Sequence, residues 1–468
     1  MRLSVAVFST GVFLLSGSAL KAENAPGGAA TTAVVSSTEA VSGPVEKRFW
    51  RAAGETVLIG WSPWVWSHYI KDYPYADISM DSVRRNFSNP PWWDADNFHT
   101  NMWGHPFQGS MYYNAARENG FNFWESAPFV ALGDFGWEYL METEPPAYND
   151  MSNTFFGGMS RGEMTHRLSV AIRDNRAHGW EKFWRELGAG FINPVGFLDR
   201  AIFGDMWKDA PNPPEHRPAK LFLMVDAGFQ HGRENSAYPN QGIFDMTLRY
   251  NDPHEAPIRK PFDYFDLRGT ISTADGPLIP FINYRGLLAG WDLKDENDVH
   301  HMISPGLTFT YFNNGPSAFG GSGLDLTVLS RWKLPREFDL RTEVGGQGYI
   351  AAGIQTDYSA NSIDATGRNY DFGSGGGPKI DVRLRRAGVD WFNFTAIAGW
   401  FPTHNGLSSQ SRIYLVDAEA RYPFTHELYA GLGWSFQERF TQYDTLPQVT
   451  KANSTVKLFL SWAFRILD

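Results

Sequence analysis

The feature that most constrains the fold is a regular alternation of apolar and polar residues, which begins near Ala219 and continues to the end of the chain. Successive side chains of a β-strand point to opposite faces, so a period of two predicts strands with one apolar face and one polar face. In the last such segment, six apolar residues occupy alternate positions: Val456, Leu458, Leu460, Trp462, Phe464 and Ile466. About twelve segments of this kind follow one another, an even number within the range of bacterial outer-membrane barrels.

Three details favour a membrane barrel over a soluble β-sandwich, which would also alternate. The polar faces carry both signs of charge, as in Asp381, Arg383 and Arg385, which suits a lumen that balances its charges. The apolar faces often end in aromatic residues, as interfacial girdles require. The last strand is amphipathic, like an outer-membrane assembly signal, although it ends on Asp468 rather than on an aromatic residue. We therefore predict a β-barrel membrane protein of about twelve antiparallel strands over residues 218–468, in contact with outer-membrane lipids.

The N-terminus predicts export. Arg2 precedes an apolar run from Leu3 to Leu15, and small residues follow up to Ala22, so residues 1–22 are expected to be a cleaved signal peptide. A retained anchor is the alternative, but the apolar run is shorter than the roughly 20 residues of a spanning helix. Residues 23–47 are rich in Ala, Ser, Thr, Gly and Pro, which is typical of a flexible tether.

Composition narrows the function classes. The net charge of −10 argues against nucleic acid as a partner. The chain has no cysteine, which excludes a disulfide framework and a thiolate nucleophile. Aromatic residues make up 15% and charged residues only 20%, an unusual balance for a soluble enzyme.

The sequence pattern of residues 48–215 predicts a mostly α-helical domain. The segment 49–70 suits a helix interrupted near Pro63, with a strand pair as the alternative. Ser110 is expected to cap a helix that ends before Gly120, and Ser160 with Glu163 to form a capping box. Other helices are expected over residues 77–86, 126–143 and 180–207, the last broken near Pro194 and suited equally to a membrane interface or to a plain surface.

The stretch from Trp92 to Arg167 concentrates polar, aromatic and glycine residues. Its motifs include Trp92-Trp93-Asp94, Thr100-Asn101, His105-Pro106, the run from Gly109 to Arg117, Trp137-Glu138, Asn149-Asp150, Gly157-Gly158 and Gly162-Glu163. On these motifs, residues 45–209 resemble the bacterial DUF3943 proteins, a family of unknown function. The resemblance implies an envelope context and no known reaction.

Several residues of this stretch are candidates for chemistry. A histidine beside a buried glutamate could activate water, so the catalytic candidates are His105, Glu138 and Glu142. An arginine could hold an anionic head group, and the ligand-binding candidates are Tyr113, Asn114, Arg117, Asp150 and Glu163.

Each candidate also has a structural explanation. Helix capping and a pair with Arg167 four residues on would account for Glu163. Asp134, Glu138 and Glu142 lie four residues apart and would form one solvated acidic stripe on a helix. His105-Pro106 would form a turn, and Tyr113 and Asn114 would pack or cap helices.

No cofactor or metal is predicted. Neither a His-Glu-x-x-His nor a Gly-x-Ser-x-Gly motif is present, and Glu163 with His166 lacks the partners of a di-metal site. The glycines of 373–377 are expected in a long loop over 356–377, and no Lys-Ser or Lys-Thr helix start follows them to bind phosphate.

Three functions remain open, and whether the protein is an enzyme is not decided by the sequence. The first is a non-enzymatic outer-membrane component that binds or passes a ligand, with the helical domain periplasmic or within the barrel. It predicts separate hydrogen-bond networks for His105, Glu138 and Glu142. The second is a membrane-associated hydrolase of envelope lipid or glycan, which predicts that these residues share one pocket. The third is a soluble periplasmic binding protein, which needs a dry core between its strands.

Overall fold

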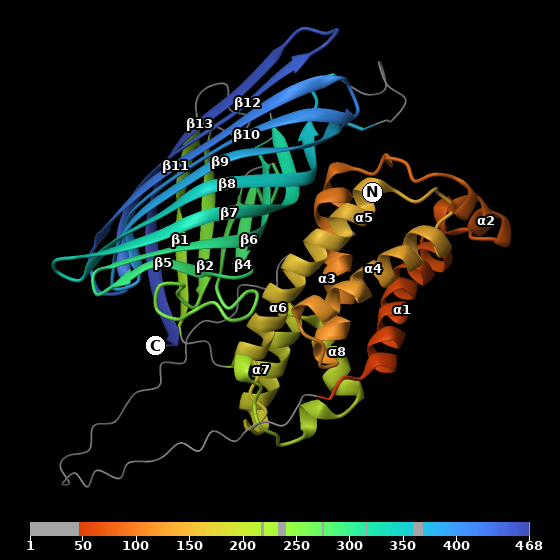
Figure 1. Ribbon diagram of the computed structural model, residues 1–468, viewed down its shortest axis with the longest axis horizontal. Coiled ribbons are helices and arrows are strands. Elements are labelled where there is room, and N and C mark those ends of the chain that lie inside the picture. The colour runs from red at the N-terminus through yellow and green to blue at the C-terminus, as the bar shows by residue number, and fades with distance from the viewer. Residues whose placement is uncertain are drawn as a thin grey trace.

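The computed structural model describes residues 46–216, 220–232, 240–273, 276–314, 317–358 and 368–467. The predicted signal peptide and all but the last two residues of the predicted tether lie outside these ranges. A helical bundle comes first in the chain and a β-barrel follows, and the two lie side by side (Figure 1).

The bundle contains eight α-helices among the described residues, and short 3-10 or π turns connect several of them. Their bounds are α1 (Phe49–Val65), α2 (Met80–Ser88), α3 (His105–Glu118), α4 (Phe123–Leu140), α5 (Tyr148–Ser152), α6 (Gly158–Ile172), α7 (Gly179–Ile192) and α8 (Pro194–Ile202). The prediction of a mostly helical N-terminal part is therefore confirmed. None of the described helices has both the length and the apolar character that crossing a membrane requires.

Two predicted helix starts are wrong. Ser110 lies inside α3, which begins at His105, and its hydroxyl donates to the carbonyl of Phe107 at 2.6 Å. Ser160 lies inside α6, because a π turn over Asn153–Gly157 joins that helix to α5, and its hydroxyl donates to the carbonyl of Phe156 at 3.0 Å. A cap needs a non-helical residue before the first turn, and the sequence pattern does not show that both serines follow residues that are already helical.

Other helix boundaries follow local chemistry. Pro63 lies within α1 and does not end it. Asn122 caps α4 through a capping box with Glu125. Gly120 follows α3 with a φ of +88°, a conformation that glycine adopts without strain.

Thirteen antiparallel strands form the described part of the barrel sheet: β1 (Leu221–Gly232), β2 (Asn240–Tyr250), β3 (Phe265–Ser272), β4 (Phe281–Leu287), β5 (Trp291–Glu296), β6 (Val299–Asn313), β7 (Ala318–Leu334), β8 (Phe338–Gln355), β9 (Tyr370–Arg386), β10 (Val389–Asn405), β11 (Ser409–Pro423), β12 (Leu428–Tyr443) and β13 (Val449–Leu467). Strand β1 pairs with β13, and β4 pairs with β6, which closes the ring. Because β5 pairs only with β6, twelve of the thirteen strands make up the closed barrel, as predicted.

The glycines of 373–377 were predicted to lie in a loop. That prediction is wrong, because they lie in β9. They allow a close approach of the neighbouring strands. A Cβ on Gly375 would lie 2.0 Å from the carbonyl oxygen of Trp400, and one on Gly376 would lie 2.0 Å from that of Gln347.

The barrel wall has an apolar outer face and a polar inner face. On β13, Leu458 is 65% exposed on the outside, whereas Lys457 and Ser461 are buried on the inside. The inner face carries paired charges, including Arg285 with Asp325 and Arg421 with Asp226. A soluble binding protein would need a dry apolar core in the same place.

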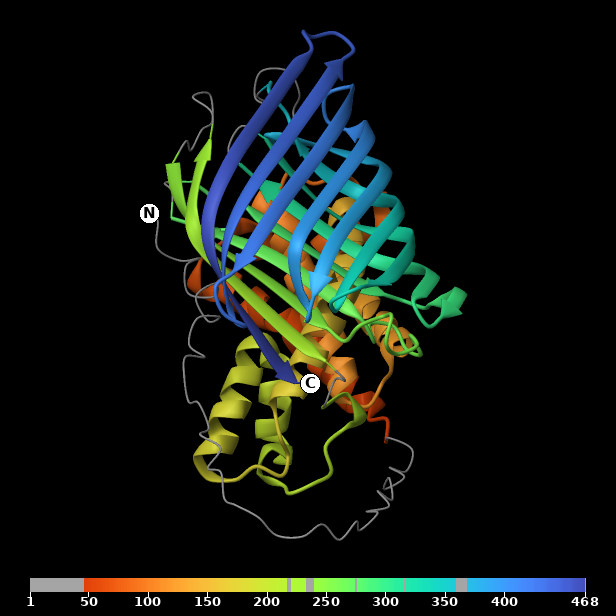
Figure 2. The ribbon, with the colours of Figure 1, turned by 90° about the vertical axis from the view of Figure 1, so that its left-hand side faces the viewer.

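The helical bundle packs against the outside of this wall. Leu307 of β6 pairs in register with the outward-facing Leu324 of β7, so Phe309 and Tyr311 also face outward. The ring of Trp103 lies 6.1 Å from that of Phe309 and 5.3 Å from that of Tyr311. The chain end of β13 lies at the end of the barrel nearest α7 and α8 (Figures 1 and 2). The bundle therefore lies beside the wall and not within the lumen. The lumen was one of the two places expected for it.

Candidate functional sites in the bundle and the lumen

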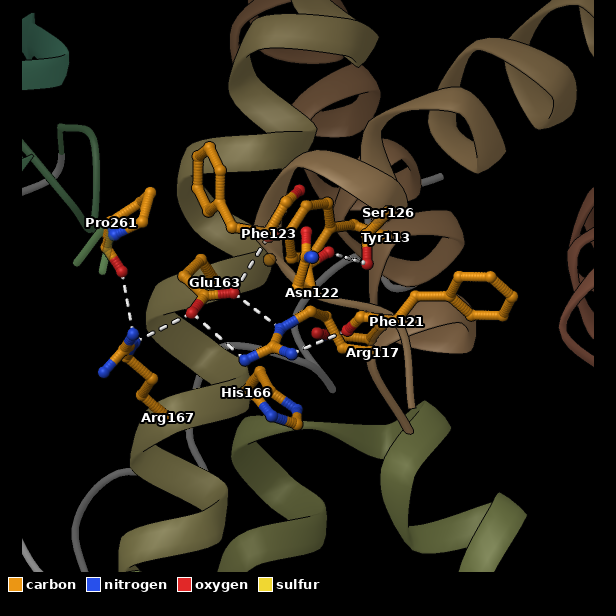
Figure 3. A network of polar contacts seen from close by, with 12 residues as sticks. Tyr113, Arg117, Phe121, Asn122, Phe123, Ser126, Glu163, His166, Arg167 and Pro261 are labelled. Atoms are coloured by element: carbon orange, nitrogen blue, oxygen red, sulfur yellow. Dashed lines mark hydrogen bonds and ion pairs between the residues drawn. The ribbon is translucent and has the colours of Figure 1, made fainter. Parts of the chain in front are cut away.

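Three of the predicted ligand-binding residues meet in one buried cluster between α3 and α6 (Figure 3). The Glu163 carboxylate is fully buried and accepts hydrogen bonds from the Arg117 guanidinium at 2.7 Å and 3.2 Å. It also accepts from Arg167 Nε at 2.8 Å and from the Tyr113 hydroxyl at 2.9 Å. Close packing of these helices requires Gly109, where a Cβ would lie 2.0 Å from the carbonyl oxygen of Thr154.

The arginines of this cluster stabilise the negative charge of its glutamate. Burial alone would raise the pKa of Glu163, but Arg117 and Arg167 outweigh burial and lower that pKa to about 2. Arg167 reaches the barrel as well, donating to the carbonyl of Pro261 at 2.7 Å and to Asp263 at 3.2 Å. The described contacts thus occupy Glu163 fully and join the bundle to the segment between β2 and β3.

The two other ligand-binding candidates lie apart from this cluster. Asn114 donates to the hydroxyl of Thr165 at 3.1 Å, also between α3 and α6. Asp150 lies in α5, where its Oδ1 is 3.1 Å from Nε2 of His105. The other ring nitrogen of His105 lies 3.2 Å from the Thr154 hydroxyl.

His105 and Asp150 are both held neutral. Burial lowers the pKa of His105 to about 4, although the negative charge of Asp94 opposes this shift. Burial, followed by repulsion from Asp94 and Glu138, raises the pKa of Asp150 well above its usual range. Nε2 of His105 and Oδ1 of Asp150 are close but do not have the geometry of a hydrogen bond. Because both pKa shifts favour the neutral forms, Asp150 does not orient His105 as the carboxylate of a catalytic pair would.

Asp134 and Glu138 of α4 face inward, and Glu142 lies two residues beyond the end of that helix and is half-buried, so the solvated stripe is not formed. Burial, and then the neighbouring carboxylates, raises the pKa of Glu138 well above its usual range. Its Oε2 accepts from the backbone N–H of Ala147 at 2.7 Å. Burial, followed by repulsion from Asp96, raises the pKa of Glu142 to about 8, and its side chain is bonded to Trp137. The three catalytic candidates therefore share an acidic region but have separate hydrogen-bond partners.

Sequence reasoning missed two polar groups of the bundle. Asn149 donates to Asp94 at 2.9 Å and to Asn101 at 2.8 Å, and Asn101 donates to the Tyr370 hydroxyl of the barrel at 2.7 Å. A second buried carboxylate, Glu118, accepts from Arg173 at 2.9 Å and Asn193 at 2.9 Å, and lies 2.9 Å from Nδ1 of His166. Little in the sequence indicates this role for Glu118, because its partners lie in α6, directly after α6 and between α7 and α8, at least 48 positions away. In the described part of the chain, no group of three or more His, Asp or Glu side chains is arranged to hold a metal ion.

The barrel lumen holds a larger charge network. Glu419 lies 2.6 Å from Lys457, 2.9 Å from Arg421 and 3.2 Å from Arg268. Beside this group lies a cavity of about 100 Å³ with a polar lining that includes Asp226, Gln230, Asp245, Asp417, Ser435 and Asn453. In the same lumen, Arg341 pairs with Asp252 and Arg249 with Asp390. None of the eight candidates from the sequence lines this cavity.

Comparisons with known proteins found one matching family model and several similar solved structures. Residues 90–195 match the model of a family described as a domain of unknown function, DUF3943. This confirms the resemblance over a shorter stretch than 45–209. No curated protein matches the chain.

Among solved structures, the chain is similar to the NanC porin, with 8% identity and a TM-score of 0.26 over 51% of this chain and 98% of that one. It is similar to the COG4313 outer membrane channel from Pseudomonas putida F1, with 12% identity and a TM-score of 0.26 over 55% of this chain and 100% of that one. A third structure is the KdgM porin in complex with disordered oligogalacturonate, with 7% identity and a TM-score of 0.20 over 52% and 99%. The residues that match the DUF3943 model lie in the bundle, and the closed barrel follows them in the chain.

Proposed function

We propose that this chain, with its DUF3943 domain beside a closed barrel, is a non-enzymatic outer-membrane protein whose lumen binds or passes a small polar ligand. One observation carries the proposal, namely the partition of the barrel wall into an exposed apolar outer face and a paired, charged inner face. Side chains that face lipid in a membrane barrel are apolar and those that face the lumen are polar.

Aromatic residues on the outer face support the membrane location. Tyr422 and Phe424 are 70% and 61% exposed near the end of the barrel where the chain ends. Toward the opposite ends of their strands, Phe229 of β1 and Trp400 of β10 are 77% and 50% exposed. Two aromatic bands that flank an apolar belt match the two interfaces of a bilayer. Outer-membrane lipids are therefore the proposed partners of the wall.

The size and chemistry of the lumen cavity limit the ligand. A cavity of about 100 Å³ has room for several water molecules or for a small polar solute. Its lining includes the paired side chains of Asp245 and Glu419 with Lys457, and of Glu419 with Arg268, so it offers both signs of charge. This supports water, a small ion or a similarly small polar solute as the ligand.

The hydrolase alternative has less support. The ring of His105 is hydrogen-bonded to Thr154, and burial favours the neutral form of the nearby Asp150, so His105 lacks the ionised partner that would strengthen it as a base. Glu138 is bonded to a backbone N–H, and Glu163 is shared between two arginines. The distances support structural roles for these side chains in the bundle.

The location is tested first by cell fractionation and by gel migration with and without heating. We expect recovery in the outer membrane and a faster-migrating unheated form. Recovery as a soluble periplasmic protein without heat-modifiable migration would overturn the proposal.

The role of the lumen is tested by single-channel recording in planar lipid bilayers. Truncating an opposed pair with Arg421→Ala and Asp226→Ala in one variant should widen the lumen and increase the conductance step. The matched control, Leu458→Ala, changes only the outer face and should leave conductance at the wild-type value. If the paired truncation and the control behave alike, the lumen is not the path.

A further inference from the structure

The exposed face of α1 is unusually apolar for a protein in water. Between Glu55 and Lys71 the chain has no Asp, Glu, Lys or Arg. Trp50, Leu58 and Trp61 are 84%, 66% and 54% exposed. A surface helix in water normally has a polar outer face. The helix instead directs apolar side chains away from the bundle.

The other outer helices also expose large apolar side chains. On α4, Trp124 and Leu132 are exposed, whereas Asp134 and Glu138 of the same helix are buried. On α7 and α8, the exposed apolar residues are Trp180, Trp184, Phe191, Leu198 and Ile202. Lys182 and Arg185 lie beside the tryptophans of α7, a combination typical of helices at a bilayer interface.

The bundle is therefore apolar outside and charged inside. Its interior holds Glu163 with Arg117 and Arg167, and Glu118 with Arg173. Soluble domains rarely bury so many charges while leaving large apolar side chains exposed. This partition matches that of the barrel wall, where the charges face the lumen and the leucines face outward.

The position of the bundle identifies what covers this face. The bundle sits on the outward side chains of the wall, through contacts such as Trp103 with Tyr311 at 5.3 Å and Trp93 with Phe372 at 5.0 Å. Elsewhere around the ring, the same outward face is the proposed lipid surface. The bundle occupies the place of lipid beside the barrel, so its own outer face continues that surface (Figure 1).

We infer that the exposed apolar face of α1, α4, α7 and α8 is covered by membrane lipid, so that bundle and barrel form one laterally joined membrane unit. This inference rests on the proposed outer-membrane location of the barrel. The tryptophans of α7 lie at the bilayer interface nearest the chain end of β13, and α1 and α4 face the lipid.

The absence of cysteine from the sequence makes a direct test available, because a single introduced cysteine can be spin-labelled without background. The variants are Leu58→Cys on α1, Leu458→Cys on the barrel belt and, as the aqueous control, Glu296→Cys, whose side chain is 65% exposed. Each labelled protein is placed in phosphatidylcholine vesicles. Collision rates are then measured with oxygen, which concentrates in lipid, and with a water-soluble nickel chelate.

We expect the labels at positions 58 and 458 to give the same high ratio of oxygen to nickel collisions, several-fold above that at position 296. A lipid ratio at 458 with an aqueous ratio at 58 would overturn the inference and leave the proposed function standing. A label at 58 that is shielded from both reagents would also overturn it, because protein and not lipid would then cover the face. An aqueous ratio at 458 would overturn the proposed location of the barrel.

Discussion

The bundle interior and the barrel lumen both bury charges beneath an apolar exterior, but they balance those charges differently. In the lumen, Glu419 has three cations within 3.2 Å, and two of them have a second carboxylate of their own, since Lys457 also contacts Asp245 and Arg421 also contacts Asp226. In the bundle, Glu163 is the carboxylate that Arg117 contacts. Removal of one carboxylate should therefore lower the free energy of unfolding less in a shared network than in a small cluster.

The acidic side of the bundle shows the opposite extreme. Asp134, Glu138 and Asp150 gather near His105, which is neutral, and no arginine is bonded to them in the described part of the chain. Burial raises the pKa of Asp134 to about 7, even though a hydrogen bond from Thr154 opposes this shift. Carboxyl groups can be buried here because they are protonated, whereas in the lumen they are paired with cations.

The largest effect is expected from Glu163→Gln in the bundle. The substitution keeps the volume but leaves Arg117 buried without a counter-charge, which typically costs about 3–5 kcal/mol. Thermal unfolding of the purified protein in detergent, followed by tryptophan fluorescence and limited proteolysis, measures the loss. A change below about 1 kcal/mol would show that the cluster does not hold α3 and α6 together.

A smaller effect is expected from the matched change in the lumen, Glu419→Gln. Lys457 and Arg421 keep Asp245 and Asp226, so the cost should be that of weakened charged hydrogen bonds, about 1.5–3 kcal/mol. The temperature at which the unheated gel form is lost reports barrel stability. If this variant is damaged more than Glu163→Gln, the contrast between a shared and an unshared network is wrong.

The pH dependence of stability separates the acidic region of the bundle from the paired charges. Asp134 has a usual pKa of 3.8 and a folded pKa of about 7, so between these values the unfolded chain releases a proton that the folded chain keeps. Stability should therefore be full below about pH 4 and fall as pH rises toward 7, by about 1 kcal/mol per pH unit. Melting temperatures at pH 5, 6 and 7 measure the slope. Glu138, Glu142 and Asp150, whose pKa values are also raised, contribute slopes of the same sign, so Asp134→Asn should reduce the slope by about 1 kcal/mol per pH unit and not abolish it. An unchanged slope would assign the titration to the other groups.

The smallest effect is expected from Glu181→Gln on α7. Its ion pair with Arg185 is 2.9 Å long, but the two side chains are 62% and 40% exposed. An exposed pair of this kind contributes about 0.3–0.5 kcal/mol. The variant serves as the control for both Gln substitutions above, and a loss comparable to theirs would show that removal of any carboxylate is harmful.

The strands were easier to predict than the helix starts, for a local reason. The alternation of β13 can be seen directly in the sequence, and each apolar position in it predicts an outward-facing side chain. Ser110 and Ser160 looked like caps because their local patterns fit, but the helices began earlier in turns that no local rule predicts. The Glu163–Arg167 pair was predictable from its spacing of four residues, whereas the bond to Arg117 joins residues 46 positions apart.

The sequence by itself determined the alternating strands, their approximate number, the helical character of the first part and the inventory of charged residues. Each of these depends on periodicity or composition, which a single chain displays directly. Only the tertiary structure decided that the bundle docks on the outside of the wall, that Glu138 and Asp134 face inward, and that Asn101 reaches Tyr370. These features depend on contacts between segments far apart in the chain, and burial in those contacts, not residue type, sets which charges are paired and which are neutral.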